Sequence, residues 1–264
     1  MSRLCRGGFL QIVMRPSQAS EAIILRTRAY GESDKIVTFL TDDAGKLTGI
    51  AKGAKNSRRR FANCLDAFTR VRAHFRIRSG AGLVFLESCD LLRPPGALSD
   101  PAKFAYGSYL IELIDQLTEE AHPVRDVYSL LAEGLDELQA GAATAAFLRV
   151  FELRLLRYAG YDPQLRSCAR CNRPAGVVEP GYLDPMQGSI VCASCRAGAQ
   201  SVLPITGQTL VLLESMKTAT LAEARQRRFS AATAAEAAQL MGHLLAQHLP
   251  RPLRSVKLIA ALAP

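Results

Sequence analysis

The sequence predicts an α+β protein with several domains: an N-terminal β-barrel of the OB type, then an α-helical domain interrupted by a four-cysteine metal module. Three observations support this fold class. Short apolar and alternating segments fill residues 21–92, apolar positions recur at helical spacing after the prolines at 94–95, and two C-x-x-C pairs lie in a stretch, 164–200, that has no periodicity. A chain of 264 residues is long enough for two domains and a small insert.

The first part of the chain has the pattern of a small barrel. Between residues 69 and 78, Val71, Ala73, Phe75 and Ile77 alternate with basic side chains, as in a strand with one buried face. Residues 42–46 have turn chemistry and join two segments into a hairpin. About five strands in roughly 70 residues fit a closed Greek-key barrel. The expected strands are 21–28, 35–41, 47–51, 69–78 and 83–87, with 91–95 closing the region.

Helices are expected on both sides of the cysteine module. Ser99 or Asp100 can cap the first of them, with Pro101 in its first turn. Thr233 and Glu236 have the spacing of a capping box for a helix that runs to about residue 248. The other helices are expected to start at Pro123 and to cover 142–158, 206–216 and 255–262. The expected units are therefore a disordered extension (1–19), the barrel (20–93), the helical domain (94–163, completed by 201–264) and the cysteine module (164–200).

The cysteine module has the spacing of a metal site. Cys168, Cys171, Cys192 and Cys195 form the pattern C-x2-C-x20-C-x2-C, which is typical of zinc sites. Four thiolate ligands leave no coordination position open, so we expect one structural Zn2+ and no catalysis at the metal. Two redox-active C-x-x-C pairs are the alternative, but the βαβ context of such pairs is missing. The remaining cysteines do not form a disulfide scaffold, which favours the cytosol.

Basic residues are concentrated in one segment. Residues 46–78 carry ten basic and one acidic side chain, a net charge of +9, which equals the net charge of the whole chain. Charge gathered in this way predicts a polyanionic partner, whereas a solvated strand face normally mixes acids and bases. The nucleic-acid contacts are expected from a loop and a strand, namely Lys52, Lys55, Arg58, Arg59 and Arg60, and Arg70, Arg72, Arg76 and Arg78.

Few aromatic residues accompany these bases. Tyr30, next to Gly31, and Phe61, beside the arginines, are the candidates for stacking on bases, while the alternation places Phe75 in the core. Few aromatics favour phosphate contacts over base reading, so we expect weak sequence dependence and steep salt dependence.

No catalytic constellation is visible, and we expect no enzymatic activity. Phosphate-binding glycine loops are absent from the sequence, and the acids at 32–43 are explained by turn formation. No apolar run reaches the ~20 residues of a membrane span. A zinc-ribbon RNA-binding or ribosome-associated protein is the main alternative, and a metal-dependent nuclease is a third possibility.

Several segments together resemble one protein family. They are EAIILRTRAYGESDKIVTFLT, the basic loop KGAKNSRRR, and FELRLLRYAGYDPQL, which leads into the cysteine pattern with GYLDPMQGSIVC between the pairs. In this order they are similar to the RecO family of bacterial recombination mediators, over about residues 20–262. The resemblance implies an OB-fold, an α-helical domain and a zinc-ribbon-like insert.

The resemblance also implies a role without enzymatic activity in RecF-pathway DNA repair, in the cytoplasm at the nucleoid. Such proteins bind single- and double-stranded DNA, anneal complementary strands, and act with RecR to load RecA on DNA coated by single-strand-binding protein. They also contact the acidic C-terminal tail of that protein, for which we expect an apolar groove with a basic rim, supplied by Arg149, Arg154 and Arg157. The matching segments place DNA contacts on Lys35, Lys52, Lys55, Arg58, Arg59 and Arg60.

Overall fold

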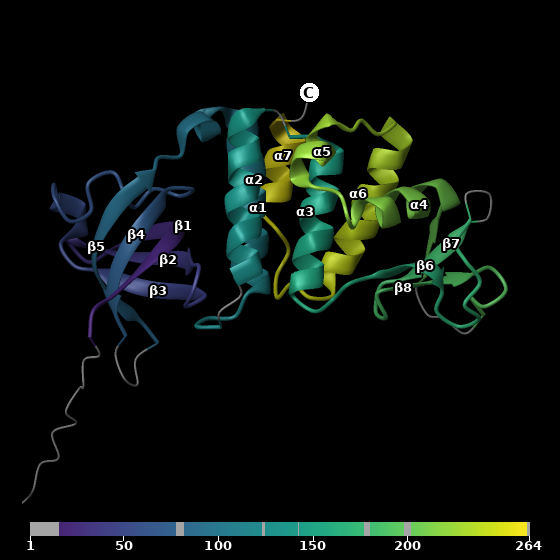
Figure 1. The fold of residues 1–264 in the computed structure, drawn as a ribbon, viewed down its shortest axis with the longest axis horizontal. Helices are drawn as coiled ribbons and strands as arrows, with labels where there is room; N and C mark the ends of the chain where they lie inside the picture. Colours follow the sequence, from purple (N-terminus) through teal and green to yellow (C-terminus); the bar gives the residue numbers. More distant parts are fainter. Residues whose placement is uncertain are drawn as a thin grey trace, which may run out of the picture.

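The computed structural model describes residues 16–77, 82–122, 125–141, 143–176, 180–197 and 202–262. The barrel lies at one end, a layer of helices occupies the middle, and a small sheet lies at the other end (Figure 1). The expected extension over 1–19 falls mostly outside the described residues. Its last two residues, Gln18 and Ala19, already belong to the first strand and pair with Phe75 and His74.

The first five strands close into a barrel in the order β1-β2-β3-β5-β4, with β4 returning to β1. All neighbours are antiparallel except β3 and β5, which pair in parallel. This is the strand order of an OB-like barrel, so the predicted fold class is confirmed. The strands are β1 (Gln18–Tyr30), β2 (Asp34–Thr41), β3 (Lys46–Ala51), β4 (Arg70–Arg76) and β5 (Val84–Arg93), with a short 3-10 turn η1 (Ala54–Asn56) after β3.

The alternation along β4 sets the barrel core. Val71, Ala73 and Phe75 are at most 1% exposed, and the rings of Phe75 and Phe39 meet edge to face inside the barrel. The predicted inward face of this strand is therefore confirmed. The segment 91–95 is not a separate closing strand, because β5 runs without a break from Val84 to Arg93.

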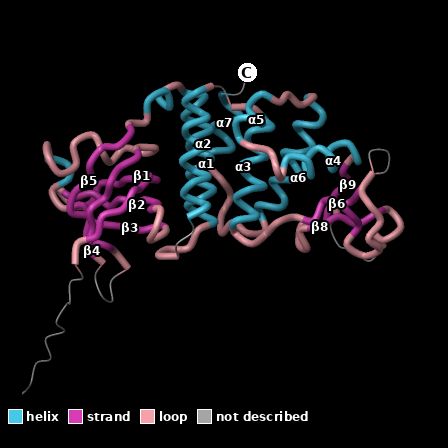
Figure 2. The backbone as a smooth tube through the Cα atoms, in the orientation of Figure 1, coloured by secondary structure: helices cyan, strands magenta, loops and turns pink. Residues whose placement is uncertain are grey.

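Seven α-helices follow within the described part of the chain, and Figure 2 shows them as one layer between the two sheets. Asp100 caps the first helix by accepting a hydrogen bond from the Lys103 amide, as expected. The third helix starts later than expected, after the N-cap Thr144. The helices are α1 (Pro101–Leu117), α2 (Arg125–Ala140), α3 (Ala145–Tyr158), α4 (Gly207–Met216), α5 (Leu221–Gln226), α6 (Ala231–Ala246) and α7 (Ser255–Leu262), with a 3-10 turn η2 (Gly96–Ser99) before α1.

The capping box expected at Thr233 and Glu236 is wrong. Ser230 caps α6, and the Glu236 carboxylate instead accepts hydrogen bonds from the amide and hydroxyl of Thr206, the N-cap of α4. A capping box does occur at Thr220 and Glu223, at the start of α5. The Thr-x-x-Glu spacing thus permits a capping box within α6, but Glu236 instead bonds the N-terminus of α4, a tertiary contact that the local sequence does not reveal.

The small sheet has the order β6-β8-β7-β9 and packs against α4. Its strands are β6 (Gln164–Cys168), β7 (Gly181–Asp184), β8 (Ser189–Cys192) and β9 (Leu203–Ile205). Buried Leu165, Leu183, Ile190 and Ile205 join the core of the helices, so the module is anchored on one face. No described helix is long and apolar enough to cross a bilayer.

Ion pairs join the barrel to the helices. The Lys46 ammonium lies 3.3 Å from the Asp115 carboxylate of α1, and Arg26 contacts the same carboxylate at 3.1 Å. Arg70 reaches Asp136 of α2 at 3.2 Å. Two bases of the +9 segment, Lys46 and Arg70, are therefore committed to contacts inside the molecule.

Candidate nucleic-acid interface and metal centre

The basic loop that follows β3 is fastened to the β1–β2 turn. The Gly53 amide donates to the Asp34 carboxylate at 2.8 Å, and the Lys55 amide donates to the Ser33 carbonyl at 2.9 Å. The Lys55 ammonium donates to the Gly31 carbonyl at 2.7 Å. Three hydrogen bonds therefore fix the start of the loop on the turn, and Gly53 adopts the left-handed backbone conformation (φ +66°) that this path requires.

Arg60 closes the other end of the loop. Its guanidinium donates to the Lys52 carbonyl at 2.8 Å and to the Glu87 carbonyl at 3.4 Å, while remaining exposed. Its backbone carbonyl accepts a hydrogen bond from the Cys89 amide of β5 at 2.8 Å. Arg60 thus shapes the loop that presents the neighbouring cations.

Four loop cations face solvent. Among the described residues, no carboxylate lies within ion-pair distance of Lys52, Lys55, Arg58 or Arg59, and all four side chains are exposed. The hydrogen bonds from Gly53 and Ser33, together with the charges of Lys52 and Lys55, hold the pKa of Asp34 below its usual value. The carboxylate therefore stays ionised as an anchor for the loop, and half-buried Lys35 lies beside it on β2.

The strand arginines differ from the loop. Arg70 is 22% exposed and bound to Asp136, whereas Arg72 and Arg76 are about half exposed and lie 3.9 Å from Glu21 and 2.8 Å from Glu87. Arg78 lies outside the described residues. The described strand arginines thus form ion pairs with nearby acids, whereas the described cations of the loop form none.

The aromatic candidates separate clearly. Tyr30 is 56% exposed, while Phe61 is 4% exposed and packs in the barrel core. The expectation that Phe61 is available for stacking is therefore wrong, because the loop folds its apolar residue inward beneath Arg60. Exposed Arg28, two residues before Tyr30 on β1, was missed, although the alternation in the sequence RTRAY places both on one face.

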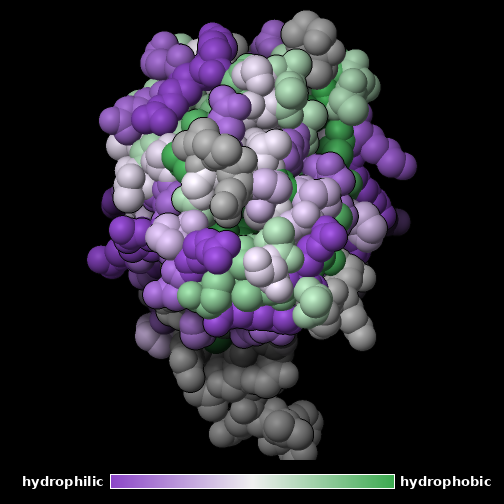
Figure 3. All heavy atoms as spheres, turned by 90° about the vertical axis from the view of Figure 1, so that its right-hand side faces the viewer, coloured by the Kyte–Doolittle hydropathy of each residue, from purple (hydrophilic) through white to green (hydrophobic). Residues whose placement is uncertain are grey.

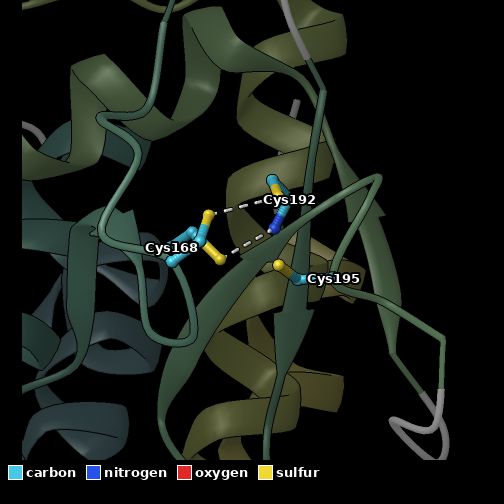
Figure 4. Close-up of side chains that lie close together, drawn as sticks. Cys168, Cys192 and Cys195 are labelled. Atoms are coloured by element: carbon cyan, nitrogen blue, oxygen red, sulfur yellow. Dashed lines mark hydrogen bonds between the residues drawn. The ribbon is translucent and has the colours of Figure 1, made fainter.

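The four predicted metal ligands meet in one cluster. The sulfurs of Cys168, Cys171, Cys192 and Cys195 all lie within 4.8 Å of one another, and those of Cys171 and Cys192 are 3.7 Å apart. Figure 4 shows Cys168, Cys192 and Cys195 directing their sulfurs toward a common point. A tetrahedral ion with metal–sulfur bonds of ~2.3 Å requires sulfurs about 3.8 Å apart. The cluster therefore fits a tetrahedral metal ion.

The electrostatics of the cluster also favour a cation. Burial opposes ionisation of Cys168, but the backbone amides of Cys171, Cys192 and Arg170 lower its pKa to about 6. The neighbouring sulfurs of Cys192 and Cys171 raise the pKa of Cys195 to about 12. Thiolates this close repel each other, so four of them require a positive charge between them.

Two arginines next to the cysteines make contacts within the module. Arg170 donates to the carbonyls of Cys195 and Ala197 at 2.7 and 2.9 Å, and the Arg196 guanidinium lies over the Tyr182 ring. Figure 3, which views the end of the molecule that carries the module, shows hydrophilic side chains interspersed with smaller hydrophobic areas. These two arginines therefore stabilise the loops that carry the C-x-x-C pairs.

An apolar groove of about 650 Å3 lies between α3, α6 and α7. On its floor, Arg149 donates to the fully buried Glu152 at 2.6 Å, and Tyr109 donates to the same carboxylate. Desolvation raises the pKa of Glu152, and the charge of Arg149 opposes that shift. The other lining residues include Leu148, Leu245, Leu249, Val256 and Ile259.

The expected basic rim of a groove is only partly on this one. Arg149 lines it, but Arg154 points to Glu133 of α2 at 2.8 Å. Exposed Arg157 is not among the residues lining the groove. Arg251 lines the groove and was missed, since it follows a proline in a connecting segment without periodicity.

Comparison with known proteins agrees with this architecture. Residues 14–95 match the family model described as Recombination protein O N terminal, and residues 98–257 match Recombination protein O C terminal. Proteins named DNA repair protein RecO are similar along most of their length. The one from Anaeromyxobacter sp. (strain K) is 37% identical over 92% of this chain and 95% of its own, and that from Syntrophus aciditrophicus is 34% identical over 93% and 96%. The chain therefore belongs to the RecO family of DNA repair proteins.

Proposed function

We propose that this chain is a recombination mediator that binds single- and double-stranded DNA through the loop of its OB-like barrel. The observation that carries this proposal is the group of exposed cations at Lys52, Lys55, Arg58 and Arg59, which have no carboxylate partner among the described residues and belong to a loop fixed on the β1–β2 turn. Cations on a rigid support contact phosphates without reading bases. Lys35, Arg60, Arg72 and Arg76 extend this proposed surface, and Arg70 contributes least because of Asp136. Arg78, outside the described residues, stays a proposed contact from the sequence alone.

Annealing follows from the same surface. Two complementary strands repel each other, and a cationic surface lowers that repulsion while the bases remain free to pair. No chemical step is needed, so we propose a function without catalysis. In this role the chain would act with RecR to load RecA on DNA coated by single-strand-binding protein, in the cytoplasm at the nucleoid.

The groove between α3, α6 and α7 is the proposed site for the acidic tail of single-strand-binding protein. Its lining is mostly apolar and includes two basic residues, Arg149 of α3 and Arg251 in the segment between α6 and α7. Glu152, which also accepts a hydrogen bond from Tyr109, holds the Arg149 guanidinium in place. An apolar side chain in the groove and a carboxylate on an arginine would together recognise such a tail.

The metal in the cysteine cluster is proposed to be Zn2+. A closed set of four thiolates suits zinc and serves folding. We also propose three functional units close to the expected ranges. The barrel (expected 20–93) starts at Gln18, the module (expected 164–200) extends through β9 to Ile205, and the helical domain (expected 94–163 and 201–264) comprises the helices on either side of the module.

Strand annealing tests the proposal. The double variant Arg58→Glu/Arg59→Glu should lose most annealing of complementary oligonucleotides, because it reverses two exposed charges without touching the internal hydrogen bonds of Arg60. Arg227→Glu/Arg228→Glu, an equal charge change in the helical domain, should anneal like the unmodified protein. Equal annealing by all three proteins would refute the DNA-binding surface. Stronger binding of a matched RNA oligomer would favour the RNA-binding alternative.

A further inference from the structure

Tyr30 is the exposed aromatic ring at the edge of the basic loop. It ends β1, pairs with Asp34 across the hairpin, and is 56% exposed. Of the phenylalanines on or next to the barrel strands, Phe39, Phe61 and Phe75 are at most 4% exposed, and Phe85 of β5 is half-buried, whereas Tyr30 is exposed. No hydrogen bond joins the Tyr30 hydroxyl to any other described residue.

The basic loop is attached to the residues around Tyr30. The Lys55 ammonium bonds the carbonyl of Gly31, the next residue, at 2.7 Å, and the Gly53 amide bonds its cross-strand partner Asp34 at 2.8 Å. Gly31 has a positive φ of 56°, and a Cβ built there would have no neighbour within 4 Å. Open space therefore lies beside Gly31, and the Lys55 ammonium is fixed on the backbone next to the exposed Tyr30.

We propose that Tyr30 is a stacking platform that makes this surface prefer single-stranded over double-stranded DNA. The inference rests on the proposed DNA-binding function. Cations contact phosphates in both forms, and each contact with the more highly charged duplex releases more counterions, so charge alone gives no preference for a single strand. An exposed ring can stack on an unpaired base, whereas the bases of a duplex are already stacked on each other.

The position of the ring suits this role. Exposed Arg28 lies two residues earlier on the same strand, and Lys55 lies on the other side of the turn. A strand whose phosphates follow these cations would pass a base over Tyr30. One ring gives stacking at a single nucleotide, which leaves the surface indifferent to most of the sequence.

Affinity measurements separate stacking from charge. Tyr30→Ala should weaken binding to a thymidine oligonucleotide by on the order of tenfold and leave duplex affinity within about twofold. The slope of log affinity against log salt should equal that of the unmodified protein, because no phosphate contact is lost. Arg59→Ala, in contrast, should lower that slope by about 0.7. Tyr30→Phe should bind as the unmodified protein does, because the ring is retained.

Fluorescence gives an independent readout. The chain contains no tryptophan, so Tyr30→Trp introduces a single reporter. Single-stranded DNA should quench it, and duplex should not. Tyr161→Trp, at a tyrosine that is 47% exposed in the helical domain, should respond to neither.

The outcomes distinguish the two proposals. If the unmodified protein binds no DNA, the proposed function and this inference both fail. If it binds DNA but Tyr30→Ala retains full single-strand affinity, or weakens both DNA forms equally, only the stacking role of Tyr30 is wrong.

Discussion

Asp34 on β2 accepts a 2.8 Å hydrogen bond from the amide of Gly53, and this contact fixes the start of the cationic loop on the β1–β2 turn. An acid in the middle of a proposed DNA surface is expected to weaken phosphate binding by its charge. Here the same carboxylate orders the cations. The loss of an anchor and the loss of a negative charge therefore act in opposite directions, and two substitutions separate them.

Asp34→Ala should lower DNA affinity severalfold, because the loop loses its anchor although the surface becomes more positive. Asp34→Asn retains an acceptor oxygen for Gly53 and removes the charge, so it should bind DNA at least as well as the unmodified protein. Fluorescence anisotropy with a labelled oligonucleotide measures both. Tighter binding by Asp34→Ala would show that the anchor is dispensable.

The buried pair of Lys46 and Asp115 predicts a stability effect without a DNA effect. Lys46→Met should lower the free energy of unfolding by about 3 kcal/mol, near the lower end for breaking a buried pair, since Arg26 remains with Asp115. Arg72→Met removes a half-exposed contact and should cost less than about 1 kcal/mol. Urea titration compares the two. A clear loss of DNA affinity in folded Lys46→Met would place this lysine at the interface after all.

Glu112 of α1 holds the start of α7. Its carboxylate accepts hydrogen bonds from the Arg254 amide and from the amide and hydroxyl of Ser255. Burial opposes ionisation, but these three bonds outweigh it and lower the pKa of Glu112. A lowered pKa gives stability that is full above the unfolded value of about 4.3 and is lost as the pH falls through the folded value.

Glu112→Ala should therefore cost about 1–3 kcal/mol at neutral pH and release α7, seen as faster amide hydrogen exchange over Ser255–Leu262. The difference from the unmodified protein should shrink as the pH is lowered below 4. An undiminished difference in acid would contradict the role of the ionised carboxylate.

The cysteine cluster predicts one bound Zn2+ per chain. Cys168→Ser should abolish the metal and unfold the module, because binding of a structural zinc is worth on the order of 10 kcal/mol to such a fold. Cys89→Ala is the control: this thiol is buried in the barrel, where desolvation raises its pKa to about 12, and metal content should not change. Elemental analysis and thermal melting measure both effects. Full metal content in Cys168→Ser would refute the metal site.

The sequence predicted those features that depend on local pattern. The alternation around Phe75 predicted the inner face of β4, because neighbouring residues of a strand point to opposite faces. The spacing of the cysteines predicted the cluster, because each C-x-x-C pair can direct two sulfurs toward one ion. Glu236 and Phe61 were misjudged for the opposite reason. Glu236 turns to α4, thirty residues earlier in the chain, and Phe61 folds under a loop whose charge suggested exposure.

The charge count had the same limit. Lys46 and Arg70 raise the net charge of the segment as much as Arg58 and Arg59 do, but their partners Asp115 and Asp136 come from helices far along the chain. Only the folded arrangement distinguishes cations used in packing from cations open to a ligand.

The most direct test of the DNA-binding account is the salt dependence of single-strand affinity. Replacing Lys52, Lys55, Arg58 and Arg59 together by Ala should lower the slope of log affinity against log salt by about 3, since each phosphate contact on a single strand contributes about 0.7. Replacing four exposed cations of the helical domain, Arg157, Arg227, Arg228 and Lys257, should leave the slope unchanged. An unchanged slope in the loop variant, or an equal fall in both variants, would contradict the account.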